Sequence, residues 1–146
     1  MTIHDVFSAD HNHLRQRIQE LQTAIDKNSS SLESLFLTFQ KEARAHFHKE
    51  DDVYYPYVDD GKKLEDRELM HTLRNDHAAV IFALESLAIR LRKKVPLAEW
   101  KIKFEIMINV LLPHFDQEEK ELFPKVEKLL PAQELQTLLE KVQTLG

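Results

Sequence analysis

"HFHKEDDVYYP" at residues 46–56 returns 68 positions later as "HFDQEEKELFP" at residues 114–124. Each copy holds a His, a Glu four residues after it, and a Pro that follows an aromatic side chain. A shorter phrase recurs too, since "DHNHL" at 10–14 is matched by "DHAAV" at 76–80, 66 positions later. These two spacings predict a pair of helices that occurs twice in the chain.

Four segments of the chain carry apolar side chains at three- and four-residue steps, which is the spacing of one buried helix face. The segments cover about 7–25, 30–57, 70–91 and 96–122. Helices of this length with short links predict an all-α protein, an up-down-up-down four-helix bundle. The residues after Pro124 predict a short amphipathic C-terminal helix that packs on the bundle.

Local signals predict details of two of these helices. Ser30 and Glu33 have the spacing of a capping box, which predicts the start of the second helix. Pro113 lies inside the fourth segment, where the missing backbone donor predicts a kink just before His114.

The composition limits the classes of function. The 146 residues suffice for one domain, expected over 1–146 with repeat halves of about 3–58 and 64–130. A net charge of -5 argues against nucleic-acid binding, and no stretch approaches the roughly 18 apolar residues of a membrane span. The absence of Cys excludes disulfides, thiolate metal sites and Cys nucleophiles. We expect a cytoplasmic protein with neither a nucleic acid nor a membrane as partner.

Six ionisable side chains occupy positions where a simple bundle would place apolar ones. They are His11, His46, Glu50, His77, His114 and Glu118. Every helix contributes one His, and the i,i+4 spacing turns each Glu toward the same side as the His before it. A single buried His is more simply explained by a hydrogen bond. Four of them with two buried carboxylates are costly unless cations satisfy them, so the six together predict a metal site.

The remaining His are expected to face solvent. They are His4, His13, His48 and His71. We call His11, His46, His77 and His114 the seam His. His13 and His48 each lie two residues beyond one of them, which is about 200° around the helix. His4 is close to the N-terminus, and His71 lies off the apolar stripe.

Other side chains near the six have a simple expected role. Asp10 and Asp76 each precede a seam His and could orient a neighbouring imidazole, although exposure on the helix surface is the simpler expectation. Tyr54, Tyr55 and Phe123 are expected to close the end of the site by packing.

The donor types indicate which metals would suit the site. Imidazoles and carboxylates without sulfur suit iron, manganese or zinc. Two carboxylates can bridge two ions and leave two His for each. Open positions on a redox-capable ion would admit dioxygen, nitric oxide or peroxide. Ferritin-like bundles use Glu-x-x-His, so the His-x-x-x-Glu order found here fits that class poorly.

These motifs, together with "NDHAAV" and "PHFDQEEKELFP", resemble the hemerythrin-like HHE cation-binding domains over residues 10 to 124. The resemblance implies a four-helix bundle with a non-haem centre of two iron ions. The ligands it implies are His11 and His46 for one ion, His77 and His114 for the other, and Glu50 and Glu118 as bridges. Leu73 stands where oxygen-carrying hemerythrins have a further His, and Glu119 where they have an Asp ligand.

We expect a protein with two iron ions that binds or reacts with dioxygen, nitric oxide or peroxide. Three hypotheses about its role stay open. The protein could bind or sense a small ligand, or it could be an enzyme that turns over peroxide or nitric oxide. It could also be a structural or metal-storing bundle that holds zinc or iron without such chemistry. A redox or signalling partner is not specified by the sequence.

Overall fold

A computed structural model describes residues 1–60 and 64–145. This part of the chain is helical and contains no strand, so the all-α prediction is confirmed. The long helices are α1 (Ile3–Asp26), α2 (Leu32–Lys49), α4 (Arg67–Arg92) and α5 (Leu97–Gln117). The shorter ones are η1 (Glu50–Tyr54), α3 (Tyr55–Asp60), η2 (Glu118–Leu122), α6 (Phe123–Leu129) and α7 (Ala132–Thr144).

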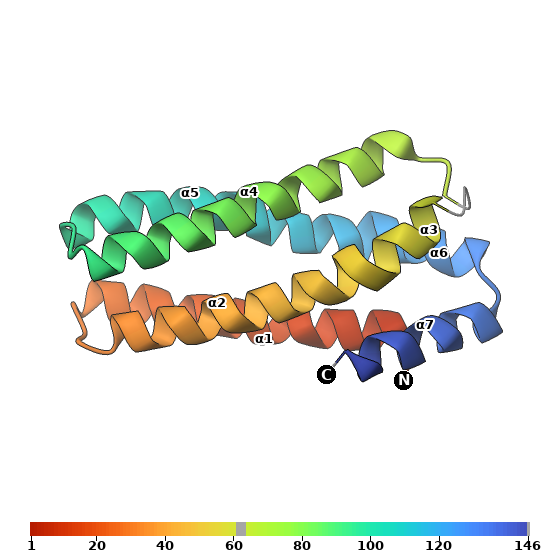
Figure 1. Ribbon diagram of the computed structural model, residues 1–146, viewed down its shortest axis with the longest axis horizontal. Helices are drawn as coiled ribbons and strands as arrows, with labels where there is room; N and C mark the ends of the chain where they lie inside the picture. The colour runs from red at the N-terminus through yellow and green to blue at the C-terminus, as the bar shows by residue number, and fades with distance from the viewer. Residues whose placement is uncertain (61–63, 146) are drawn as a thin grey trace.

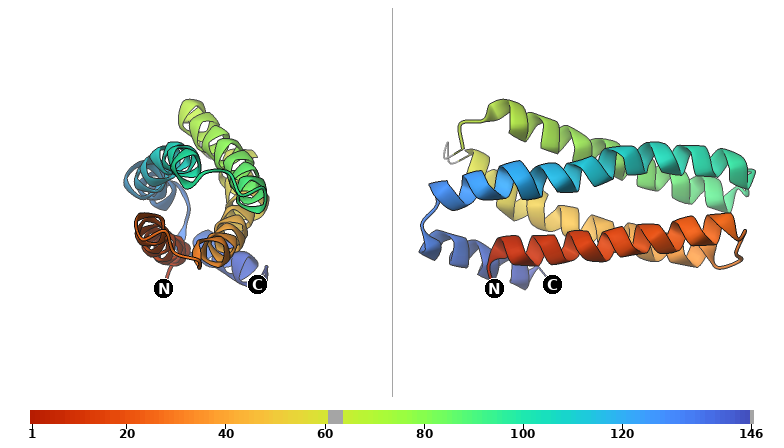
Figure 2. Two further views of the ribbon diagram at one scale, coloured as in Figure 1. Left: turned by 90° about the vertical axis from the view of Figure 1, so that its left-hand side faces the viewer. Right: turned by 180° about the vertical axis from the view of Figure 1, so that it is seen from behind.

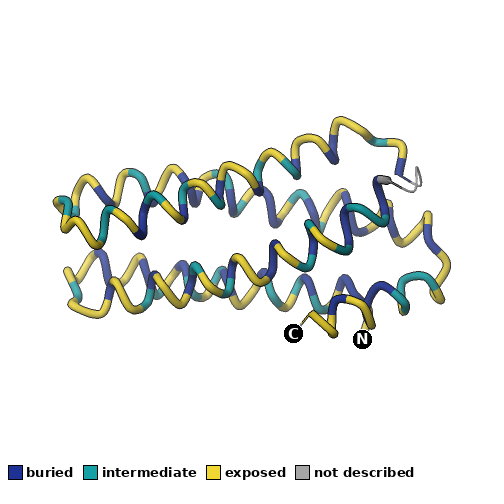
Figure 3. The backbone as a smooth tube through the Cα atoms, viewed as in Figure 1, coloured by how far each residue is buried: buried dark blue, intermediate teal, exposed yellow. Residues whose placement is uncertain are grey.

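The four long helices lie side by side as a bundle around a common interior (Figures 1 and 2). The α1–α2 and α4–α5 turns lie at one end of the bundle, and α7 lies at the other end (Figure 1). Buried residues recur along the inner side of each long helix (Figure 3). No helix in the described part of the chain is both long and apolar enough to cross a membrane.

The helix starts differ in part from the local signals. At α1, Thr2 and Asp5 form a capping box that satisfies two free backbone donors. The capping box predicted for Ser30 and Glu33 is wrong, because the residue before α2 is Ser31 and its side chain makes no cap hydrogen bond. Instead, Ser29 Oγ accepts the Ser31 backbone N–H, and the helix begins one residue later than expected. Pro113 lies inside α5, which continues through it to Gln117.

The two copies of the repeated phrase each contain a π-helical turn. In η1 the Tyr55 backbone N–H donates to the Glu50 carbonyl, and in η2 the Phe123 N–H donates to the Glu118 carbonyl. Each turn therefore begins at the repeated Glu and ends two residues before the repeated Pro. A proline ring clashes with the carbonyl four residues earlier in a regular α-helix, and the wider π turn gives it room.

Two apolar clusters of the core lie on either side of the seam His. One fills the end near the α1–α2 and α4–α5 turns and includes Phe36, Trp100 and Phe104. The other includes Phe7 and residues of η1, α6 and α7. Members of one cluster precede each of these four His in the chain and members of the other follow it. The polar layer is therefore enclosed by apolar packing at both ends.

Candidate metal centre

The structure brings the six predicted residues together in one buried layer. None of their side chains is more than 3% exposed. His11 comes from α1, His46 from α2, His77 from α4 and His114 from α5, while the two Glu begin the π turns. All six side chains point inward, as their helical periodicity predicts.

The six side chains form two groups that share both carboxylates. One contains His11 and His46 with Glu50 and Glu118, and the other contains His77 and His114 with the same two Glu. In each group the candidate ligand atoms lie within 4.8 Å of one another. Each group therefore offers two imidazoles and two carboxylates to a cation.

Each carboxylate contacts one His from each group. Glu50 Oε1 lies 3.1 Å from His46 Nε2 and 3.2 Å from His77 Nε2. Glu118 Oε1 lies 3.2 Å from the Nε2 atoms of both His11 and His114. Both carboxylates thus lie between the two groups, which is the position that a bridging ligand requires.

The imidazoles approach one another through the same nitrogen. His11 Nε2 and His46 Nε2 are 3.1 Å apart, and His77 Nε2 and His114 Nε2 are 2.9 Å apart. All four Nε2 atoms therefore converge on the shared carboxylates.

Three of the four oxygens of the buried carboxylates have no hydrogen-bond partner among the residues that the structure describes. Both oxygen atoms of Glu50 and Oε1 of Glu118 are buried without a hydrogen-bond partner. Leaving a buried charged acceptor unpaired is costly, and cations held between the two Glu would remove that cost. The donor set and these unpaired oxygens fit hard or borderline metal ions such as iron, manganese and zinc.

A second set of carboxylates holds the outer nitrogen of every seam His. His11 Nδ1 donates to Glu119 at 2.6 Å, and His77 Nδ1 donates to Asp51 at 2.7 Å. His46 Nδ1 donates to Asp10 at 3.0 Å, and His114 Nδ1 donates to Asp76 at 3.1 Å. A carboxylate only accepts, so the proton of each neutral ring lies on Nδ1 and the Nε2 lone pair faces the centre. This is the tautomer that binds a metal through Nε2.

These orienting carboxylates are only partly evident from the sequence. Of the two roles open for Asp10 and Asp76, the structure shows the orienting one, because each accepts a hydrogen bond from a His on the neighbouring helix. For Asp51 and Glu119 the sequence analysis contains no such expectation. Each directly follows a repeated Glu, so an acid at the same place in both copies was the available signal.

Comparison with protein families connects this geometry to a known group. The model described as the hemerythrin HHE cation binding domain matches residues 2–126. The chain belongs to this hemerythrin HHE family. Comparisons with curated proteins and with solved structures found no match.

Two positions set this hemerythrin-family chain apart from the oxygen-carrying pattern. Leu73 is fully buried in the apolar cluster, and Glu119 orients His11 through its Nδ1. The carboxylate that faces the centre from the fourth helix is therefore Glu118.

The shared carboxylates control the protonation of this hemerythrin-family site. Burial lowers the pKa of His46, but Glu50, Asp10 and Glu118 outweigh it and raise the pKa to about 10. For His114, Glu118 and Asp76 likewise outweigh burial and raise the pKa to about 10. Burial raises the pKa of Glu118, but His114 lowers it well below its usual range. The two carboxylates therefore retain cations, either protons on the imidazoles or metal ions.

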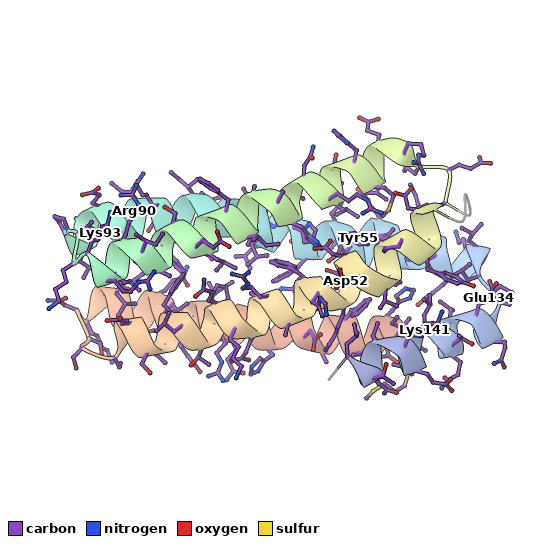
Figure 4. All side chains as sticks on the ribbon, viewed as in Figure 1. Asp52, Tyr55, Arg90, Lys93, Glu134 and Lys141 are labelled. Atoms are coloured by element: carbon purple, nitrogen blue, oxygen red, sulfur yellow. The ribbon has the colours of Figure 1, made fainter. Side chains whose placement is uncertain are left out.

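Tyr55 has a polar role beyond the packing that was expected of it. Its hydroxyl donates to Glu118 Oε2 at 2.8 Å, and its ring stacks on His77 with centroids 4.9 Å apart. Tyr55 lies where α3 begins and is labelled in Figure 4. The aromatic side chain thus closes the centre and also holds one carboxylate oxygen.

The other four His divide into three exposed ones and one buried one. His13 pairs with Glu42 and His48 pairs with Asp52, both on the outside of the bundle, and His71 is exposed. The expectation that His4 faces solvent is wrong, since His4 is only 4% exposed. Tyr54 and the stacked ring of Phe123 cover it, because the end of the fourth-helix segment folds over the N-terminal turn.

Proposed function

We propose that this chain is a non-haem di-iron protein that binds or reacts with dioxygen, nitric oxide or peroxide. The observation that supports it most is the position of the two carboxylates. Glu50 and Glu118 each contact one His from each group. Three of their four oxygens have no hydrogen-bond partner among the described residues. Two bound cations would satisfy both the charge and these oxygens.

The roles of the side chains follow from their contacts. His11 and His46 would hold one ion and His77 and His114 the other, with Glu50 and Glu118 between the ions. Bound iron supplies one-electron redox chemistry and open positions for a small ligand. The chain itself keeps each imidazole in the Nε2-binding tautomer and excludes bulk water through the two apolar clusters.

The proposal includes the organisation of the chain. We infer one domain over 1–146 built from two related helix pairs in an up-down-up-down order. The positions of the α1–α2 and α4–α5 turns at one end of the bundle support this order (Figure 1). A cytoplasmic location belongs to the same proposal and is supported by the composition of the chain.

Elemental analysis with visible spectroscopy tests this function. Protein prepared without oxygen should contain about two iron ions per chain, the number expected for two ligand groups that share their carboxylates. Its visible spectrum should change when dioxygen, nitric oxide or hydrogen peroxide is added. Zinc in place of iron, or a spectrum that none of the three ligands changes, would favour a structural or metal-storing bundle.

A steady-state assay then separates binding from catalysis. A binding or sensing protein should take up a stoichiometric amount of nitric oxide or peroxide per centre, with no further consumption. An oxidoreductase should consume many equivalents per centre when a reductant is present. Glu50→Ala is the matched control, because it removes a shared carboxylate from both groups.

A further inference from the structure

His4, Tyr54 and Glu127 form a hydrogen-bonded row that the proposed metal ligands do not use. His4 Nε2 lies 2.7 Å from the Tyr54 hydroxyl, and His4 Nδ1 lies 2.8 Å from Glu127 Oε1. Tyr54 is fully buried and His4 nearly so, whereas the Glu127 side chain is 53% exposed. The row therefore leads from the interior of the bundle to solvent.

The acceptor at the outer end determines the direction of both hydrogen bonds. The Glu127 carboxylate only accepts, so His4 Nδ1 carries a proton and donates it. In the neutral ring Nε2 then carries a lone pair and no proton, so it accepts a hydrogen bond from the Tyr54 O–H. The Tyr54 phenolic proton is thus hydrogen-bonded to a base, His4, and His4 is in turn hydrogen-bonded to the Glu127 carboxylate.

The surroundings keep both groups neutral at rest. Burial, followed by the charges of Glu118 and Glu50, raises the pKa of Tyr54 well above its usual range. Burial also lowers the pKa of His4, despite the opposing effect of Glu127. A buried phenol that lost an electron without losing its proton would leave an unsolvated positive charge, so a proton acceptor is needed.

The inner end of the row lies beside the candidate metal centre. The rings of Tyr54 and Tyr55 have centroids 6.1 Å apart, and the Tyr55 hydroxyl donates to Glu118 Oε2. Two adjacent aromatic rings therefore connect His4 to a carboxylate of the centre.

The other half of the repeat has no such row. Met70 stands 66 positions after His4, and Leu122 stands 68 positions after Tyr54. Both are buried in the apolar cluster at this end of the bundle. Apolar side chains thus fill the equivalent place, so packing alone does not require a His and a Tyr here.

We propose that Tyr54 is a redox-active tyrosine that gives one electron, through Tyr55, to the oxidised metal centre and its phenolic proton to His4. The O–H bond of Tyr54 breaks and an N–H bond forms at His4 Nε2. A neutral tyrosyl radical is left beside an imidazolium paired with Glu127, and the centre is reduced by one electron. A peroxide is the oxidant that first oxidises the centre, so this step rests on the proposed function.

Photo-oxidation of the zinc-loaded protein tests the Tyr54–His4 pair without iron chemistry. Photogenerated ruthenium(III) tris(bipyridine) should produce a tyrosyl radical that electron paramagnetic resonance detects. Tyr54→Phe should lose the signal, while the matched Tyr57→Phe should keep it. Glu127→Gln changes a largely exposed side chain and should slow radical formation, because the imidazolium loses its negative partner. A radical that persists in Tyr54→Phe would overturn the proposal.

Of two further measurements, the first does not depend on how a core variant folds. Radical formation in the wild-type zinc form should be slower in heavy water, because the proton moves with the electron. An equal rate in both solvents would contradict transfer to His4. In His4→Gln, which keeps an acceptor but removes the base, the radical should be lost even where the Tyr54 hydrogen bond survives. A full radical yield in that variant would mean that His4 only satisfies the phenol.

The iron form tests the link to the centre. Hydrogen peroxide should oxidise the iron, seen in the visible spectrum, and produce the Tyr54 radical in the same sample. Iron oxidation without that radical would overturn the redox role of Tyr54 and leave the proposed function standing. If peroxide leaves the iron unchanged while the zinc form still gives the radical, the proposed peroxide chemistry fails, and with it the oxidant of this step.

Discussion

The Tyr55 hydroxyl lies 2.8 Å from Glu118 Oε2, whereas Phe123, its counterpart 68 positions later, has no hydroxyl to offer Glu50. This difference explains why Glu50 has two unpaired oxygens and Glu118 has one. The two repeated phrases therefore build similar positions with unequal hydrogen bonding. The centre is asymmetric even though the motif that forms it is repeated.

Removal of the Tyr55 hydroxyl should destabilise the protein without emptying the site. Tyr55→Phe leaves a buried carboxylate oxygen unpaired, and hydrogen bonds to charged groups are worth about 1.5–3 kcal/mol. We expect a loss of that order in the free energy of unfolding by urea, with the zinc content unchanged. Equal stability of Tyr55→Phe and wild type would show that the hydroxyl contributes nothing.

Loss of a shared carboxylate should remove metal and thermal stability together. Glu50→Ala and Glu118→Ala each take a ligand from both groups, and metal binding stabilises only the folded chain. We expect metal affinity to fall by more than about 100-fold, since even orienting residues cost 10–100-fold. Metal analysis and thermal unfolding with and without a chelator measure both effects.

His13→Ala and His48→Ala are the controls for the carboxylate variants. Both side chains face outward and pair with exposed or half-exposed acids. Metal content and melting temperature should remain those of wild type. If either control loses metal, the assignment of these two His to the outside of the site is wrong.

The orienting carboxylates can be tested with two adjacent residues. Asp51 accepts from His77 Nδ1, whereas Asp52 pairs with exposed His48 (Asp52 is labelled in Figure 4). Asp51→Asn should weaken metal binding by about 10–100-fold, because the ring loses the acceptor that holds its tautomer. Asp52→Asn should leave the affinity unchanged. Titration with cobalt(II) or zinc gives both values, and identical affinities would refute the orienting role of Asp51.

Metal uptake should release protons and should tighten as pH rises. His46 and His114 have pKa values of about 10 in the metal-free protein, so both carry a proton at neutral pH. A metal ion must displace those protons, and affinity should therefore increase up to about pH 10. Calorimetry in buffers of different ionisation enthalpy measures the proton count. Uptake without proton release would contradict protonation of these imidazoles.

The metal-free protein should have the opposite pH dependence in its stability. The pKa values of His46 and His114 are raised above the ordinary value of 6.5, so protonation stabilises the folded state. This contribution is complete below about pH 6.5 and is lost as pH rises toward about 10. Urea unfolding of the chelated protein across that range should show a falling stability. A stability that rises over the same range would refute the raised pKa values.

The residues of the centre were predictable because their direction depends on local geometry. A His and a Glu four residues apart on one helix face point the same way whatever the rest of the chain does. The apolar stripe then decides which way is inward, so His46 and Glu50 could be placed from their own segment. The repeat showed that His114 and Glu118 follow the same rule.

The hydrogen-bond partners of these His side chains could not be predicted from local helix geometry. Asp10 meets His46 and Asp76 meets His114 across helix pairs, at positions 36 and 38 residues apart in the chain. Such contacts depend on how far each helix is rotated and shifted against its neighbour. The same holds for buried His4, which α6 covers from the far end of the sequence.

The sequence alone determined that the protein is helical and which six side chains face its interior, because helical periodicity is a property of each segment. Three features depend on contacts between helices: each carboxylate touches a His from each group, four outer acids hold the imidazoles, and Tyr55 and Tyr54 make the two halves unequal. These features arise where separate helices meet, and the register between helices is determined by packing of the whole bundle.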